Sequence, residues 1–257
     1  MDEIKLEPIL IKNGVLFLSE IRNEFESAYL KVREKEKRIY SDVELLNLPF
    51  ASEKNPHRTE WLLRAKSFLR FKNYLKSEKG EANILDLGCG NGWFCGQLSK
   101  SLNHNFFCVD VNLTELVQGR RALNSGKLRF IYADIFKTKF PEKCFDYILI
   151  NAAVQYFPDL SKLLNKLLTP INENGEIHII DSAIYSVDEA IKAKERTKNY
   201  YSSLGFPEMA DNYYHHTWNE LSEFNFEILY QPNSLSGKIK RLFLKADSPF
   251  PWIKITR

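Results

Sequence analysis

Residues 84–92 read Ile-Leu-Asp-Leu-Gly-Cys-Gly-Asn-Gly and carry the clearest chemical signal in the chain. An apolar run ends there at three alternating glycines, Gly88, Gly90 and Gly92, and a helix-like run follows at 93–102. Glycine permits positive φ angles and a close approach of the backbone to a ligand. The free N–H groups at the start of a helix attract polar or anionic groups. The pattern therefore predicts a strand, a tight glycine turn and a helix that face a bound ligand.

Acidic residues stand at the ends of three predicted strands. Asp86 lies one residue before the end of the first strand, where burial of a carboxylate is costly unless it has a partner. Asp110 closes the predicted strand 105–110, roughly twenty residues after the glycine turn, where an acid can accept hydrogen bonds from both hydroxyls of a ribose. Asp134 directly follows the predicted strand 128–133. Asp110 thus indicates an adenosine ribose, and the structural alternatives are a helix cap at Asp110 and a simple turn at Asp134.

The segment Asp-Leu-Gly-Cys-Gly-Asn-Gly resembles the first motif of the class I S-adenosylmethionine-dependent methyltransferases. Residues 167–177 resemble the family's third motif, and the resemblance is continuous from about residue 82 to 182. It implies that S-adenosylmethionine is the cofactor, with the glycine turn at its methionine end, Asp134 at the adenine amino group and the backbone of Ile135 at a ring nitrogen. The implied cofactor-binding residues are Asp86, Gly88, Cys89, Gly90, Gly92, Asp110, Asp134, Ile135 and Asn151.

Alternating strands and helices from residue 84 onward predict a parallel sheet with helices on both faces. Two final strands are predicted, and the resemblance implies that they form an antiparallel pair at one edge. The expected fold is α/β and doubly wound, with a mostly parallel seven-stranded sheet, an antiparallel last strand and an N-terminal helical cap. The predicted strands span residues 84–87, 105–110, 128–133, 145–150, 176–181, 226–231 and 251–256.

The N-terminal region, residues 1–80, contains little that looks like strand. Helices are predicted at 19–38 and 59–76 from their apolar spacing. We therefore expect a helical cap over residues 1–80 and a methyltransferase core over 81–257, with a substrate-wall insertion at about 183–225. Tyr40 and Arg58, in the loop between the two helices, are candidate substrate residues or simply surface residues. The basic link at 237–246 is either a solvated face or an anion-binding one.

The segment after the fourth strand reads Asn151-Ala-Ala-Val-Gln-Tyr-Phe. Members of the resembled family that methylate amino groups of nucleic acids or glutamine usually have Asn-Pro-Pro-aromatic here, so the missing Pro-Pro pair argues against those substrates. Gln155 and Tyr156 are candidate substrate residues, and packing roles are the alternative.

The insertion carries Tyr214, His215 and His216, which are candidates for a catalytic base. Adjacent histidines in a strand face opposite sides, so one of the two is expected to serve a given site. The structural alternative is an ordinary aromatic loop packed on the sheet.

Net charge, cysteine spacing and the length of apolar segments limit the kinds of partner that we expect for the protein. The net charge of the 257 residues is +3 and there is no lysine-rich arm, which argues against a nucleic-acid partner. The cysteines, Cys89, Cys95, Cys108 and Cys144, have no metal-ligand spacing. Reduced thiols, the absence of a signal-peptide pattern and the absence of a membrane-span-sized apolar segment predict a cytoplasmic protein without a bound metal or membrane association.

The sequence therefore predicts an S-adenosylmethionine-dependent methyltransferase that moves a methyl group to an O or N atom of a small molecule. Three alternatives stay open: a methyltransferase acting on protein or RNA, a nicotinamide-dependent oxidoreductase, and a catalytically silent cofactor-binding interaction module. The oxidoreductase shares the glycine turn and Asp110, but residues 86–92 fit Gly-x-Gly-x-x-Gly poorly. Oligomeric state is not predicted.

Overall fold

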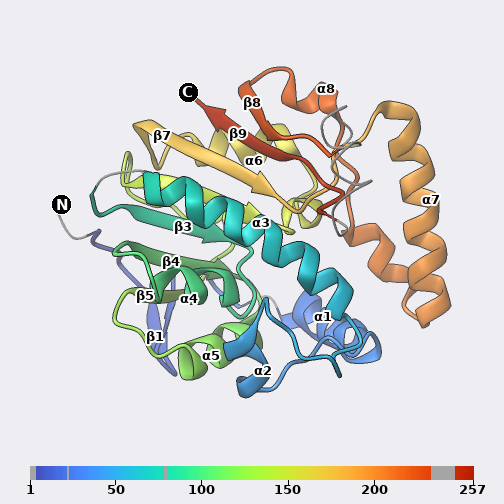
Figure 1. Cartoon of the computed structure of the whole chain (residues 1–257), viewed down its shortest axis with the longest axis horizontal. Helices are drawn as coiled ribbons and strands as arrows, with labels where there is room; N and C mark the ends of the chain where they lie inside the picture. Colours follow the sequence, from blue (N-terminus) through green and yellow to red (C-terminus); the bar gives the residue numbers. More distant parts are fainter. Residues whose placement is uncertain (1–3, 22, 78–79, 233–246) are drawn as a thin grey trace.

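A nine-stranded sheet forms the centre of the computed structural model, which describes residues 4–21, 23–77, 80–232 and 247–257 (Figure 1). The strand order is β1-β2-β5-β4-β3-β6-β7-β9-β8. The strands are β1 (Leu10–Lys12), β2 (Val15–Phe17), β3 (Asn83–Leu87), β4 (Asn105–Asp110), β5 (Leu128–Tyr132), β6 (Phe145–Asn151), β7 (Ile171–Ile180), β8 (Asn225–Tyr230) and β9 (Trp252–Thr256). The basic link predicted at 237–246 lies outside the described residues.

The predicted α/β fold is confirmed. Strands β3 to β7 pair in parallel, and β9 runs antiparallel to both β7 and β8, as expected for the last strand. Strand β7 begins at Ile171 rather than at residue 176, since Phe145 pairs with Ile171 across an irregularity. The segments that alternate between sheet and helix in the sequence thus occupy the positions that the doubly wound arrangement requires.

The predicted strand number, seven, was wrong, because a hairpin at the N-terminus adds two strands. Asn13 and Gly14 adopt positive φ angles of 53° and 74° in a tight turn between β1 and β2. Strand β2 then pairs in parallel with β5, with Val15 opposite Phe130. Each hairpin strand has only three residues, which is too short for an alternating pattern to stand out in the sequence.

The helices cover both faces of the sheet (Figure 1). They are α1 (Asn23–Lys35), α2 (Asp42–Asn47), α3 (Arg58–Ser77), α4 (Trp93–Ser99), α5 (Leu113–Ala122), α6 (Leu160–Leu167), α7 (Val187–Leu204) and α8 (Trp218–Leu221), with short 3-10 turns η1 (Val154–Tyr156) and η2 (Pro207–Asn212). The unpredicted helix α2 begins at a capping box in which Ser41 and Glu44 bond each other's backbone N–H groups.

Alternate residues of each strand enter different cores, as a strand's geometry requires. On one face, Ile84 of β3 packs with Phe68 and Phe71 of α3 and with helices α4 and α5. On the other face, Leu85 packs with the leucines of α6, whose spacing of three and four residues gives that helix one apolar side. The segments that follow β3 to β6 lie at one edge of the sheet, where they line a cavity together with residues of α1 and α3.

Within the described ranges, every helix is too short or too polar to cross a bilayer.

Candidate functional site

The glycine turn after β3 has the left-handed backbone geometry that its composition predicts. Gly88, Gly90 and Gly92 have φ angles of 75°, 56° and 71°. A Cβ atom on Gly88 would lie 2.5 Å from the Cβ of Ala153, and one on Gly92 would lie 2.8 Å from the Phe130 ring. Both contacts are too short for a side chain, so the turn needs glycine for space as well as for φ.

Asp110 at the end of β4 holds this turn in place. Its Oδ2 accepts a hydrogen bond of 2.7 Å from the N–H of Gly90. Its Oδ1 accepts 2.7 and 2.8 Å bonds from the N–H groups of Val111 and Asn112. Burial raises the pKa of Asp110, while these three donors act in the opposite direction. A carboxylate oxygen accepts two bonds, so Oδ1 is fully used while Oδ2 can still receive a ribose hydroxyl. Helix capping is done by Asn112, which accepts the N–H of Glu115 at 3.1 Å.

Two buried oxygens at the edge of the sheet have no hydrogen-bond partner among the described residues. They are Oδ1 of Asp86 on β3 and Oδ1 of Asn151 at the end of β6. The other oxygen of Asp86 accepts the Cys95 thiol at 3.3 Å, and burial raises the pKa of Asp86 well above its ordinary range. Buried acceptors without partners are costly, and a donor such as an ammonium group of a ligand would satisfy them.

Asp134 and Ile135 follow β5 at the same edge. The N–H of Asp134 donates to Oγ of Ser19 at 3.0 Å, and Oδ1 of Asp134 accepts the N–H of Phe136 at 3.1 Å. Ile135 is buried beside them. Ser19, the first residue of the helix predicted at 19–38, lies before α1 and ties the segment after β2 to this end of the site.

The carboxyl ends of β3, β4, β5 and β6 surround one cavity of about 440 Å³, which we call the first cavity. Eight of the nine predicted cofactor-binding residues line it, together with Tyr29 and Arg33 of α1 and Trp61 of α3, whereas Gly92 does not. Its volume is in the range of sites for cofactor-sized ligands. Residues that the sequence predicts to bind the cofactor therefore lie around one cavity. They stand at the ends of four strands and are up to 65 positions apart (Asp86 to Asn151).

Glu115 also lines the first cavity, and sequence reasoning missed it. Burial and the nearby Asp110 and Glu26 raise its pKa to about 7, although Arg33 acts in the opposite direction. A signal was present in the sequence, since Asn112 and Glu115 stand three apart at a helix start. Asn112 Nδ2 donates to Glu115 Oε2 at 3.1 Å, which turns the carboxyl toward the glycine turn.

A second cavity of about 330 Å³ adjoins the first and extends between α1, α3, α7 and η2. The residues that line both cavities are Tyr29, Arg33, Arg38, Arg64, Gln155 and Tyr156. Gln155 is held by a 2.7 Å bond from its Nε2 to the carbonyl of Ala152, and the Tyr156 ring packs edge-on against Tyr29 and Tyr213. Gln155 and Tyr156, both predicted pocket residues, thus form part of the passage between the cavities.

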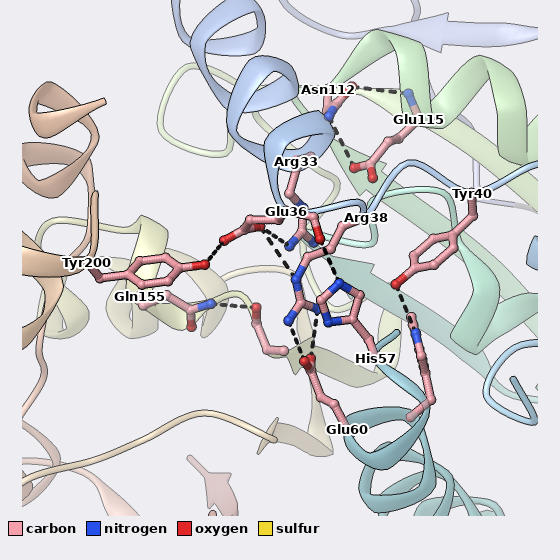
Figure 2. Close-up of polar contacts among 12 residues, drawn as sticks. Arg33, Glu36, Arg38, Tyr40, His57, Glu60, Asn112, Glu115, Gln155 and Tyr200 are labelled. Atoms are coloured by element: carbon pink, nitrogen blue, oxygen red, sulfur yellow. Dashed lines mark hydrogen bonds and ion pairs between the residues drawn. The ribbon is translucent and has the colours of Figure 1, made fainter. Parts of the chain in front are cut away.

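A chain of polar contacts joins three helical segments around the second cavity (Figure 2). Tyr200 of α7 donates its hydroxyl to Glu36, beside the end of α1. Glu36 pairs with Arg38, whose Nη1 donates to Oε1 of Glu60 on α3 at 3.1 Å. His57 adds a 2.7 Å contact from its Nε2 to the carbonyl oxygen of Glu36. Helix α7 and the N-terminal region are therefore tied together across this cavity.

The three candidate bases occupy different places. Tyr214 lines the first cavity and donates its N–H to the carbonyl of Gln155 at 2.7 Å. His215 lines neither cavity but contacts Thr197 of the second at 2.8 Å. Burial, followed by Arg196, lowers the pKa of His215. His216 is 2% exposed, and its ring nitrogens contact Glu220 at 3.0 Å and the carbonyl of Val154 at 3.1 Å.

The two remaining substrate candidates, Tyr40 and Arg58, lie in different places relative to the cavities. Tyr40 lines the first cavity, and its hydroxyl accepts the Nε1–H of Trp61 at 2.9 Å. Arg58 lies outside both cavities, with Glu53 4.0 Å away. In the described part of the chain no cluster of His, Cys, Asp and Glu could hold a metal ion, and all four cysteines are free thiols.

Comparison with known proteins defines the class. A family model described as a methyltransferase domain matches residues 78–243, and the chain belongs to this family. It is a class I S-adenosylmethionine-dependent methyltransferase domain, and S-adenosylmethionine is its cofactor. The buried acceptors of Asp86 and Asn151 fit the amino group of that cofactor, and the carboxylate of Asp110 fits its ribose. The nicotinamide-dependent alternative is therefore set aside.

Individual relatives are distant. The chain is 25% identical to demethylmenaquinone methyltransferase of Staphylococcus saprophyticus over 70% of its own length and 78% of the relative. It is 30% identical to malonyl-[acyl-carrier protein] O-methyltransferase 1 of Ilyobacter polytropus over 40% of its own length and 39% of the relative. An S-adenosylmethionine-dependent methyltransferase structure from Mesorhizobium loti superposes with a TM-score of 0.54 at 19% identity, covering 76% of this chain and all of that one. The first curated relatives are matched over 38% to 51% of their length.

Proposed function

We propose that the protein transfers the methyl group of S-adenosylmethionine to an O or N atom of a small molecule bound in the second cavity. The observation that carries this proposal is the adjoining pair of cavities, which meet at Gln155 and Tyr156. A concave site of about 330 Å³ suits a small acceptor better than a folded macromolecule. The names of two relatives, which refer to a malonyl group on a carrier protein and to demethylmenaquinone, are consistent with a small methyl-accepting group.

Alignment and exclusion of water are the main tasks that such a site performs. S-adenosylmethionine, when bound, supplies a methyl group on a positively charged sulfur. Asp110 would accept a ribose hydroxyl through Oδ2, Asp134 and Ile135 would meet the adenine, and Asp86 with Asn151 would receive the amino group. These contacts would point the reactive end toward Gln155 and Tyr156.

The acceptor atom attacks in line, so that the bond from the methyl carbon to sulfur breaks as the bond to O or N forms. A protonated acceptor must also lose a proton. His215 is a candidate to receive it through the Thr197 hydroxyl, because its lowered pKa keeps the ring neutral at pH 7. Tyr214 is the second candidate, since it lies on the wall of the first cavity. We assign His216 a structural role because protein groups already contact both of its ring nitrogens.

Transfer of radiolabelled methyl groups tests the proposal. The protein is incubated with methyl-labelled S-adenosylmethionine and a cell extract, which is then separated into small-molecule, protein and RNA fractions. We expect label in the small-molecule fraction, and none with the cofactor-site variant Asp110→Ala. Label confined to protein or RNA would support the macromolecular alternative. Cofactor binding without transfer to any fraction would support the silent interaction module.

A further inference from the structure

The walls of the second cavity carry an excess of positive charge. Its charged side chains are four arginines, Arg33, Arg38, Arg64 and Arg196, and two glutamates, Glu36 and Glu60. A concave site with low-dielectric walls concentrates such a field, so the cavity favours a ligand of negative charge.

The two glutamates are already shared between arginines. Glu60 receives both Arg38 and Arg64, with the Nε of Arg64 3.0 Å from Oε1. These two guanidinium groups lower the pKa of Glu60 to about 2 in spite of its burial, so it is ionised at neutral pH. Glu36 stands 3.5 Å from both Arg33 and Arg38. Each carboxylate therefore serves two cations, and within the lining of this cavity the arginines outnumber the glutamates by two.

Arg33 and Arg196 have hydrogen-bonding capacity to spare. The Nε of Arg33 is buried and has no hydrogen-bond partner among the described residues, and its guanidinium lies 5.1 Å from the centre of the Tyr29 ring. Within the same ranges, Arg196 of α7 makes no hydrogen bond or ion pair. A buried guanidinium N–H without an acceptor is costly, and an oxyanion is the group that arginine binds best.

The aromatic part of the cavity indicates what else the ligand carries. Tyr156, Tyr201 and Tyr213 surround one end, where Tyr156 also borders the first cavity. A ligand with its anionic group at Arg33 and Arg196 would therefore extend its other end along these rings toward the passage at Gln155 and Tyr156.

We propose that the methyl acceptor carries an oxyanion, a carboxylate or a phosphate, that Arg33 and Arg196 bind in the second cavity. The inference rests on the proposed function, because it identifies the chemical class of acceptor that the second cavity takes. The two arginines hold the acceptor by its anionic group, and its methyl-accepting O or N atom faces the first cavity.

Binding of simple anions to the cofactor-loaded protein tests this. The full chain is saturated with S-adenosylhomocysteine, which fills the first cavity, and is titrated calorimetrically with phosphate, sulfate, acetate or malonate. We expect millimolar binding of at least one anion. Arg33→Gln and Arg196→Gln should each weaken it at least tenfold, and Arg196→Lys should recover part of the loss. Arg121→Gln, which removes an exposed arginine of α5 outside both cavities, is the matched control and should leave binding unchanged.

The relative affinities of these anions also show whether the acceptor carries a phosphate or a carboxylate. Tighter binding of phosphate and sulfate points to a phosphate ester, and tighter binding of acetate or malonate points to a carboxylic acid. Absence of anion binding in the loaded protein, or equal binding by all variants, would overturn the inference. A failure of the proposed function is different and separately visible, since it would appear as missing methyl transfer to small molecules. Thermal denaturation of each variant shows whether it is folded.

Discussion

The first and second cavities share one wall but differ in charge. The first has five carboxyl groups, from Glu26, Asp86, Asp110, Glu115 and Asp134, against three arginines. The second has two carboxylates against four arginines. The strands and the residues directly after them supply most of the acids, whereas the N-terminal region and α7 supply all of the arginines. The difference suits a positively charged cofactor in the first cavity and a negatively charged acceptor in the second.

The two cavities also differ in how far apart in the sequence their contacting residues lie. In the first cavity, Asp110 accepts hydrogen bonds from the N–H groups of Gly90 and Val111. All three residues lie within a few positions of the ends of β3 and β4. In the second cavity, Tyr200, Glu36 and Glu60 come from three elements that only the folded chain brings together. We therefore expect changes in the first cavity to have the larger effects.

The largest effect is expected for Asp110→Ala. The change leaves three backbone N–H groups without their acceptor and removes the predicted ribose ligand. Affinity for S-adenosylhomocysteine should fall by a factor of about 100 or more, because several charge-assisted bonds are lost. Calorimetric titration measures the change. Asp188→Ala, at an exposed position of α7, is the control and should bind normally; equal loss in both variants would contradict a specific role.

Gly88→Ala should have the next largest effect. The new Cβ would meet Ala153 at 2.5 Å in a backbone with a φ angle of 75°. We expect cofactor affinity to fall at least tenfold, with a loss of about 1–3 kcal/mol in the free energy of unfolding from strain. Chemical denaturation and cofactor titration measure both quantities.

Gly126→Ala provides the matched control for Gly88→Ala. An added Cβ at Gly126 meets nothing within 4 Å, and its φ angle is not positive. This variant should keep the stability and cofactor affinity of the natural chain. A Gly88→Ala protein that behaved in the same way would show that the turn tolerates a side chain.

The same contrast explains how much the sequence could predict. The cofactor residues are recognisable because each stands at a fixed place relative to a strand end, and the sheet register then sets their spacing. Arg33, Arg64 and Arg196 were not predicted as site residues, because only tertiary packing brings these three helical positions to a shared cavity. The three-residue strands β1 and β2 were missed for a related reason: their burial depends on pairing with β5.

Substitutions of His215 and His216 test the role of the segment between η2 and α8. His216 is buried with both ring nitrogens in contact with protein groups, so His216→Ala should lower the free energy of unfolding by about 1–3 kcal/mol. Cofactor affinity should change little, because His216 lies outside the first cavity. His215→Ala should affect stability less and methyl transfer more. Denaturation midpoints and transfer rates of the two variants distinguish the roles, and the reverse pattern would exchange the assignments.

The smallest effect concerns Glu115, whose raised pKa couples the first cavity to pH. Near pH 7 its carboxyl changes from neutral to negative as pH rises, beside Asp110, Glu26 and Arg33. S-adenosylmethionine carries one more positive charge than S-adenosylhomocysteine, so its relative affinity should rise a few-fold between pH 6 and 8. Glu115→Gln should flatten this dependence.

Stability provides an independent check on Glu115. A folded-state pKa of about 7, above the ordinary 4.5, means that the native chain holds this proton more tightly than the unfolded chain. The contribution of Glu115 to the free energy of unfolding is therefore fully present below pH 4.5 and is lost as pH rises to about 7. Relative to Glu115→Gln, the natural chain should lose stability across that window. If the stabilities of the two proteins instead change in parallel with pH, Glu115 is already ionised across this window. The first cavity then presents more negative charge to its cofactor than the raised pKa implies.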